Sequence, residues 1–297
     1  MQNKLTKIKG NLIILLTAII WGTSFVSQKV GMESISPAEF NGIRCLLGAI
    51  VLLPVIWIFD KGKSKEALAA EKEKKGILIK NGFICGIFLC FATALQTWGL
   101  CYTTSGKSGF ITAMYMILVP FIGAALLKKK FPKTAYIAAV IAFAGLYMLC
   151  SGSIKDGFNK GDFLTFLCAI MFSFHILAVD KFSPEVDGIK LSCLQFFVSG
   201  ILNILYALFT KKPDFGLILS CAVPIIYSGI MSCGVAYTLQ IIGQKYTDAA
   251  SASILMSLES VFALISGMII LHETISPVEL LGCLLMFGAI ILNTVKS

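Results

Sequence analysis

Three ionisable side chains stand inside long apolar runs of the sequence, where a charge is costly. Glu259 lies near the middle of the run 248–271, His175 lies in the run 162–181, and Arg44 is the single arginine of the chain. A carboxylate at the centre of a bilayer costs about 2.5–3.5 kcal/mol on insertion scales. We therefore expect Glu259 to face a cavity or a partner, where it could bind a substrate amine or a proton. A structural hydrogen bond between helices is the alternative.

His175 and Arg44 each allow two interpretations. Histidine is the side chain best suited to titrate near neutral pH, so His175 is a second candidate for proton coupling. A packed, hydrogen-bonded core histidine accounts for its position equally well. Arg44 could bind a carboxylate through two parallel hydrogen bonds. The interpretation that we favour is an anchor at the membrane interface, or a fixed pair with an acid such as Glu39.

Neutral polar and aromatic side chains recur at helical spacing inside the same runs. Trp21 and Ser24 share one face of the first run, and Phe172 and His175 share the matching face of the sixth. Such stripes on apolar helices indicate the lining of a cavity, although polar groups that join helices give the same pattern. The residues expected to line a cavity are Trp21, Ser24, Gln96, Thr112, Tyr115, Phe172, His175, Tyr237, Gln240 and Glu259.

The composition identifies the elements that must carry these side chains. Of the 297 residues, 57% are hydrophobic and 14% are charged, whereas soluble domains carry about 25% charged residues. The chain is therefore expected to be an integral membrane protein. Its apolar runs are continuous and do not alternate, which favours helices over a barrel. Since about 20 apolar residues span a bilayer as a helix, ten spans are predicted, at about 11–31, 38–58, 77–101, 105–127, 133–151, 162–181, 189–209, 216–242, 248–271 and 277–295.

The sequence contains an internal repeat. The phrase Leu-Gln-x-x-Gly-x-x-Tyr-Thr begins at Leu95 and again at Leu239. A shift of 144 residues aligns 85–143 with 229–287 without a gap, and the polar Gln96 then matches Gln240. Matches between apolar segments arise easily by chance, but an ungapped match that includes a glutamine indicates a true repeat.

A second alignment extends the repeat toward the beginning of each half. A shift of 151 residues aligns 10–50 with 161–201. Each half then holds five spans, and because five is odd, the second half must enter the membrane from the opposite face. The predicted fold is an all-α membrane protein with ten transmembrane helices in two inverted five-helix repeats, residues 1–152 and 160–297. Many secondary transporters have this arrangement.

The lysines predict the orientation. With a cytosolic N-terminus, eighteen lysines fall on the cytosolic side and six outside. The positive-inside rule then places both termini in the cytosol of a multi-pass protein of the plasma (inner) membrane. The net charge of +9 comes from lysines that flank apolar runs, so no nucleic-acid partner is expected. Ten cysteines without a Cys-x-x-Cys pair indicate helix packing, and no metal or cofactor is expected.

Several stretches resemble a known family. WGTSFVSQKVGMESISPAEFNGIRCLLGAIVLLP, GFITAMYMILVPFIGAALL and SLESVFALISGMIILHETISPVELLGCLLMFGAIIL are similar to EamA-like members of the drug/metabolite transporter superfamily. The resemblance covers about residues 8–296 and implies ten helices around a central cavity lined by spans 1, 3, 4, 6, 8 and 9. Members move small metabolites, commonly outward. Ser260 stands where the family usually has proline after a Leu-Glu pair, which predicts a less kinked helix there.

These observations predict a secondary active transporter, and not an enzyme. We expect an exporter of small metabolites such as amino acids, amines or drugs, which works by alternating access within the lipid bilayer. Coupling to protons is a hypothesis that rests on Glu259 and His175, and both a monomer and a homodimer are open. One alternative is a membrane-embedded enzyme, although the charged loops lack a cluster of catalytic groups. The other is a non-transporting membrane sensor or scaffold, which would leave the same sequence pattern.

Overall fold

The protein is built of helices that are joined by short connections. The computed structural model describes residues 4–103, 105–149, 159–210, 213–271 and 276–296, and it contains no strand among them. The predicted all-α class is confirmed. The elements are α1 (Lys4–Gly31), α2 (Pro37–Lys61), α3 (Lys65–Glu73), α4 (Lys75–Leu100), α5 (Ser105–Ala113), α6 (Tyr115–Leu127), α7 (Lys133–Leu149), α8 (Lys160–Phe182), the short η2 (Ser183–Glu185), α9 (Gly188–Thr210), α10 (Phe215–Ser220), α11 (Ala222–Tyr227), the π-helix η3 (Ser228–Tyr237), α12 (Thr238–Gln244), α13 (Ala249–Met256), α14 (Glu259–Leu271) and α15 (Pro277–Lys296).

The apolar helices match the predicted spans in position. Within the described residues, seven helical segments are long and apolar enough to cross a membrane. The chain is thus an integral membrane protein. Three shorter apolar helices, Lys133–Met148, Ala249–Ile265 and Pro277–Asn293, lie where the fifth, ninth and tenth spans are expected. Ten crossings, and the inverted relation of the two halves, stay predictions.

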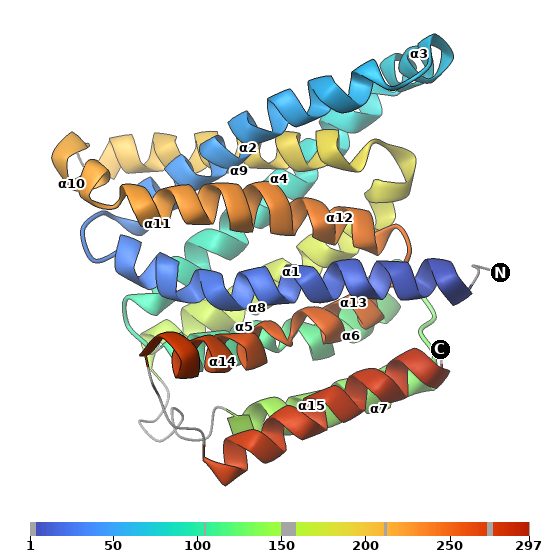
Figure 1. Ribbon diagram of the computed structural model, residues 1–297, viewed down its shortest axis with the longest axis vertical. Helices are drawn as coiled ribbons and strands as arrows, with labels where there is room; N and C mark the ends of the chain where they lie inside the picture. Colours follow the sequence, from blue (N-terminus) through green and yellow to red (C-terminus); the bar gives the residue numbers. More distant parts are fainter. Residues whose placement is uncertain (1–3, 104, 150–158, 211–212, 272–275, 297) are drawn as a thin grey trace.

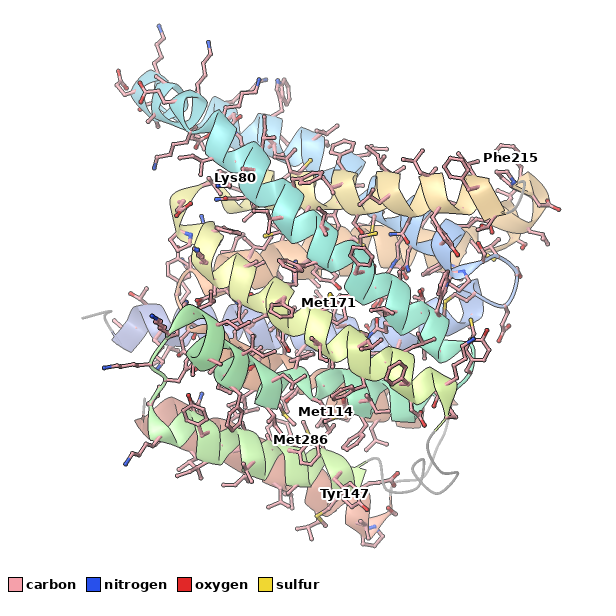
Figure 2. All side chains as sticks on the ribbon, turned by 180° about the vertical axis from the view of Figure 1, so that it is seen from behind. Lys80, Met114, Tyr147, Met171, Phe215 and Met286 are labelled. Atoms are coloured by element: carbon pink, nitrogen blue, oxygen red, sulfur yellow. The ribbon has the colours of Figure 1, made fainter. Side chains whose placement is uncertain are left out.

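Helices from the two halves of the sequence lie side by side (Figure 1). α7 packs along α15, α2 along α9, α4 along α8, and α1 along α12 and α14. The α7 and α15 pair forms a layer of its own at one edge, where Figure 2 labels Tyr147 on α7 and Met286 on α15. The described ends of the chain lie on the same side of the bundle (Figure 1). Each half therefore depends on the other for most of its packing.

Polar caps set the starts of two of the long helices. Ser36 Oγ accepts a hydrogen bond from the backbone N–H of Glu39, and the Glu39 carboxylate accepts one from the backbone N–H of Ser36. Asn159 and Asp162 form the same reciprocal box at the start of α8. Such a box satisfies two backbone donors that the first turn leaves free.

The polar insertion of the first half folds as α3 and extends beyond the bundle (Figure 1). Lys63 Nζ lies 2.6 Å from Glu71 Oε1 and 2.8 Å from Asp187 Oδ2, and Lys190 Nζ lies 2.7 Å from Glu71 Oε2. Burial disfavours the charged forms, but these hydrogen bonds outweigh it: they raise the pKa of Lys63 and lower the pKa of Asp187. The cluster fixes α3 to the beginning of α9 in the other half.

Candidate functional site

A small cavity lies inside the bundle between helices of both halves. Its free volume is about 30 Å³, which is room for one or two water molecules and too little for a metabolite. The described conformation therefore leaves no room for a metabolite at the centre of the bundle. The cavity is lined by Trp21, Phe25, Gln28, Arg44, Gln96, Thr112, Tyr115, Phe172, Ile176, Ser232, Tyr237, Gln240, Met256 and Glu259.

Much of the lining consists of residues that the two sequence shifts make equivalent. A cavity that lies between two repeats should be lined by equivalent positions of each repeat. The shift of 151 residues relates two such pairs, and the shift of 144 relates three more. The pairs are Trp21 with Phe172, Phe25 with Ile176, Gln96 with Gln240, Thr112 with Met256, and Tyr115 with Glu259.

Two interrupted helices bring the pair Tyr115 and Glu259 into the cavity. The predicted fourth span is broken at Met114, between α5 and α6 (Met114 is labelled in Figure 2), so that α6 begins at Tyr115. The predicted ninth span is broken at 257–258, and α14 begins at Glu259. Met114 and Leu258 are equivalent under the shift of 144 residues. Both breaks therefore stand at the same place in the repeat.

The break before Glu259 lies where the sequence predicts a less kinked helix, and that comparison with the family stays a prediction. Ser260 replaces the usual proline, yet the helix is interrupted. The Ser257 hydroxyl donates to Ile254 O over 2.7 Å, and the backbone N–H of Leu258 and of Ser260 reach only three residues back. Serine hydroxyls that compete for backbone carbonyls bend helices, and the tighter turn ends the α-helix without a proline.

Tyr115 and Glu259 touch each other inside the cavity. The Tyr115 hydroxyl donates a hydrogen bond to Glu259 Oε1 over 3.1 Å. The two residues are 3% and 5% exposed, so little solvent reaches the carboxyl group. A buried carboxylate is stable only with a partner, and one phenolic donor does not neutralise a charge. Glu259 is placed to take up a cation or a proton.

Arg44 also faces the cavity, which corrects the interpretation that we favoured from sequence. Its side chain is 2% exposed and lines the cavity, so it is not an anchor at the surface of the protein. It does not pair with Glu39, whose carboxylate caps α2. Arg44 Nε donates to Asn41 Oδ1 over 2.9 Å, and the guanidinium lies 5.6 Å from the centre of the Phe40 ring. No carboxylate of the described residues is within ion-pair distance of it, so its charge is available to a ligand.

Both predicted glutamines line the cavity. Gln96 Nε2 donates to Thr112 Oγ1 over 3.2 Å, so these two expected residues are joined. Gln240 Nε2 donates to Gln244 Oε1 over 3.0 Å, while the buried Gln240 Oε1 has no hydrogen-bond partner. Gln28 Oε1 is unpartnered in the same way. Unpaired buried acceptors are costly, and these two could receive donors from a ligand.

Aromatic side chains form another wall. The rings of Trp21 and Tyr237 meet edge to face with centroids 4.6 Å apart, and Phe172 also lines the cavity. The Trp21 Nε1–H is buried without an acceptor. A flat apolar surface with one free N–H donor suits a ligand that carries an apolar group and an acceptor.

Ser24 and His175 are the two expected residues that do not line the cavity. Both are buried, at 1% and 0% exposure. His175 Nε2 is 2.9 Å from Gln195 Oε1, and its ring packs against the ring of Tyr237 at 6.1 Å. Tyr237 thus contacts His175 and also lines the cavity. Ser24 and His175 follow Trp21 and Phe172 by three residues. The residues that do line the cavity beside Trp21 and Phe172 follow them by four.

Five lining residues are absent from the set of expected residues given above, although Gln28 lies on the same helical stripe as Trp21 and Ser24. Phe25 and Ile176 follow Trp21 and Phe172 by four residues, so a choice of i+4 in place of i+3 would have found them. Ser232 comes from the π-helix η3, whose extra residue per turn changes the exposed face. Helical periodicity could not have identified it. The missed residues are Phe25, Gln28, Ile176, Ser232 and Met256.

The side chains that line the cavity can bind a ligand. Among the described residues, no group of three His, Cys, Asp or Glu side chains could hold a metal ion. The cavity offers a guanidinium, a carboxyl group, amides and aromatic rings. These groups fit a small polar molecule with both donors and acceptors.

Comparisons with known proteins agree with these features. The sequence model of the EamA-like transporter family matches twice, over residues 8–151 and 159–295. An uncharacterized transporter of Archaeoglobus fulgidus is 31% identical over 98% of this chain and 87% of its own length. The uncharacterized transporter YoaV of Bacillus subtilis is 24% identical over 97% of both chains. A solved crystal structure superimposes over 97% of both chains with a TM-score of 0.78 at 16% identity, so the fold is shared. The chain belongs to the EamA-like transporter family.

Proposed function

We propose that this membrane transporter is a secondary active exporter of small zwitterionic or cationic metabolites, with amino acids, amines and amine-bearing drugs as its substrate class. The observation that carries the proposal is a single cavity that both Arg44 and Glu259 line. Arg44 and Glu259 can carry opposite charges, and the structure shows no ion pair between them. Unpaired charges are costly inside a membrane protein. A ligand that satisfies both would explain why they are there.

The cavity favours a ligand with separate acidic, basic and apolar parts. Arg44 would bind a carboxylate through its planar guanidinium. Glu259 would bind an ammonium group, and the ring wall formed by Trp21, Phe172 and Tyr237 would pack against a side chain. A simple amine would use Glu259 without Arg44.

Proton coupling follows from the same carboxyl group. Glu259 is closed off from solvent, and an isolated charge there is unfavourable. The Glu259 carboxyl group would therefore bind either a proton or a cationic substrate. Each transport cycle would carry a substrate across the membrane in one direction and a proton in the other. His175 stays a secondary candidate, which could act on the cavity only through Tyr237.

Transport would proceed by alternating access between the two halves. Support comes from the repeat in the sequence, from lining residues that are equivalent in both halves, and from the two helix breaks at matching positions. The outward direction rests on the likeness to the EamA-like family alone.

Flux measurements in proteoliposomes test the function. The purified protein is reconstituted, loaded with a panel of radiolabelled amino acids and amines, and assayed with and without a pH gradient. We expect counterflow of at least one compound and faster flux with an inward proton gradient. Glu259→Gln keeps a hydrogen-bond acceptor for Tyr115 but cannot ionise, so its flux should not depend on the gradient.

Gly288→Ala is the matched control, because a Cβ atom at Gly288 on α15 meets no other atom within 4 Å. This variant should transport like the native protein. Flux of the native protein that is identical with and without the gradient would contradict proton coupling. Absence of counterflow for every amino acid and amine would contradict the proposed substrate class.

A further inference from the structure

A short motif, Lys-Gly-Asn or Lys-Gly-Asp, stands in the first turns of the helix that opens each half. It occupies 9–11 in α1 and 160–162 in α8, and the shift of 151 residues relates the two copies. Each copy packs against the Gly-x-x-Tyr-Thr end of the repeated phrase, and each takes the phrase from the other half. The N-terminal clamp is Lys9, Gly10 and Asn11 with Gly243, Tyr246 and Thr247, and the opposite clamp is Lys160, Gly161 and Asp162 with Gly99, Tyr102 and Thr103.

The N-terminal clamp joins the start of α1 to the turn after α12. Thr247 Oγ1 donates to Asn11 Oδ1 over 2.5 Å, and Lys9 Nζ lies 5.8 Å from the centre of the Tyr246 ring. The backbones approach so closely that a Cβ atom on Gly10 would lie 2.8 Å from Tyr246 Cβ. Any larger residue at this position would force the two segments apart.

The opposite clamp joins the start of α8 to the turn after α4 by the same set of contacts. Thr103 Oγ1 donates to Asp162 Oδ1 over 2.6 Å, and Lys160 Nζ lies 4.9 Å from the centre of the Tyr102 ring. A Cβ atom on Gly161 would lie 2.6 Å from the backbone oxygen of Gly99. Both clamps thus contain a hydrogen bond from a threonine hydroxyl, a lysine near a tyrosine ring and a close contact at a glycine, at equivalent positions.

The two clamps lie at opposite ends of the bundle (Figure 1). α1 begins beside the marked N-terminus, next to the turn between α12 and α13, whereas α8 begins at the other side, beside the end of α4. The cavity lies between them, since α1 contributes Trp21, Phe25 and Gln28 farther along its length. Both clamps are formed in this structure, which agrees with the small size of the cavity.

We propose that the two clamps are the gates of the transporter and open reciprocally: release of one exposes the cavity to one side while the other stays formed. The proposal rests on the proposed alternating access. Each clamp bridges the two halves, so a tilt of one half against the other must separate one set of contacts before the other. Close glycine contacts and single hydrogen bonds hold the ends with small energies that thermal motion can overcome.

Hydrogen–deuterium exchange on the full-length protein in nanodiscs tests this without any substrate. Thr247→Val and Thr103→Val form a matched pair, because each keeps the shape of the side chain and removes one hydroxyl donor. In Thr247→Val we expect exchange to rise about two- to tenfold at both segments of the N-terminal clamp. At the opposite clamp, exchange should fall below the native rate. Thr103→Val should give the mirror image.

The fall at the distant clamp separates a gate from a simple packing contact. Loosening of a packing contact would raise exchange locally and leave the other end unchanged, and that result in both variants would overturn the proposal. Thr247→Ser and Thr103→Ser retain the hydroxyl and should restore the native pattern. If a valine variant fails to fold, Tyr246→Leu and Tyr102→Leu form the second pair, with the same expected and contradicting results. Reciprocal exchange without flux of any tested solute would support the gates and contradict the substrate class.

Discussion

Arg44 and Glu259 both line the cavity, and in the proposed function they divide the recognition of a ligand between them. Both are predicted as chemically significant from the sequence, because a charge inside an apolar run is costly. The sequence does not reveal which way an arginine side chain points. A long side chain two turns inside a helix can reach either the interface or the interior, and only the packing of α2 decides between them. The same limit explains Ser24 and His175, which share a stripe with lining residues but are buried outside the cavity.

At the residue scale we predict that Arg44→Lys separates two kinds of substrate. Lysine retains the charge but not the planar fork that binds a carboxylate with two hydrogen bonds. The affinity for amino acids should fall by at least about tenfold, which corresponds to about 1.4 kcal/mol. Simple amines, which lack a carboxylate, should bind as to the native protein. Thermal-shift titrations with an amino acid and with the decarboxylated amine measure both. An equal loss for the two ligands would show that Arg44 only supports the fold.

The helices themselves are predicted well from hydropathy, because each apolar run is long and its ends carry lysines or turn residues. Their internal breaks are not. The apolar runs that look continuous in the sequence are interrupted between α5 and α6, between α13 and α14, and at the π-helix η3. Such interruptions depend on side-chain competition for backbone carbonyls and on contacts with neighbouring helices. Neither is visible in the hydropathy of a single run.

At the element scale we predict that Ser260→Pro is tolerated. Ser260 lies in the first turn of α14, where its N–H makes one long bond of 3.3 Å to Ser257 O. Proline in a first turn removes little, so the loss of stability should stay below about 1 kcal/mol. Leu264→Pro, in the interior of the same helix, is the contrasting variant and should cost about 3 kcal/mol. Melting temperatures of the two purified variants decide the matter. A severe loss with Ser260→Pro would mean that the break needs the serine itself.

At the scale of the whole molecule, the repeat is visible in the sequence and the cavity between its copies is not. The two shifts align residues along the chain, but the crosswise contacts of α1 with α12 and of α4 with α8 appear only in three dimensions. The repeated phrase that begins at Leu95 and at Leu239 contributes to two different places. In the structure, Gln96 and Gln240 of that phrase line the cavity, while its Gly-x-x-Tyr-Thr part packs at the ends of the bundle.

The orientation in the membrane can be tested with a single exposed thiol. Cys101 is exposed, whereas the other described cysteines are buried or only partly accessible. With both termini in the cytosol, Cys101 lies on the outer side, and a membrane-impermeant maleimide should label it in intact cells. Cys150, which lies outside the described residues, is replaced by serine in the tested protein, and a further Cys101→Ser change is the control. Labelling that occurs only in inverted vesicles would mean the opposite orientation.

The contact between Tyr115 and Glu259 has a consequence for the symmetry of the two halves. Positions 115 and 259 are counterparts in the repeat, and their side chains touch. In a pair of identical units, a residue at such a place meets its own copy. A glutamate there would have faced a second glutamate, and two neighbouring carboxylates cannot both stay ionised. A lone acid opposite a tyrosine requires two copies with different sequences. A single chain that holds both halves supplies this difference, since each half has its own residue at the position.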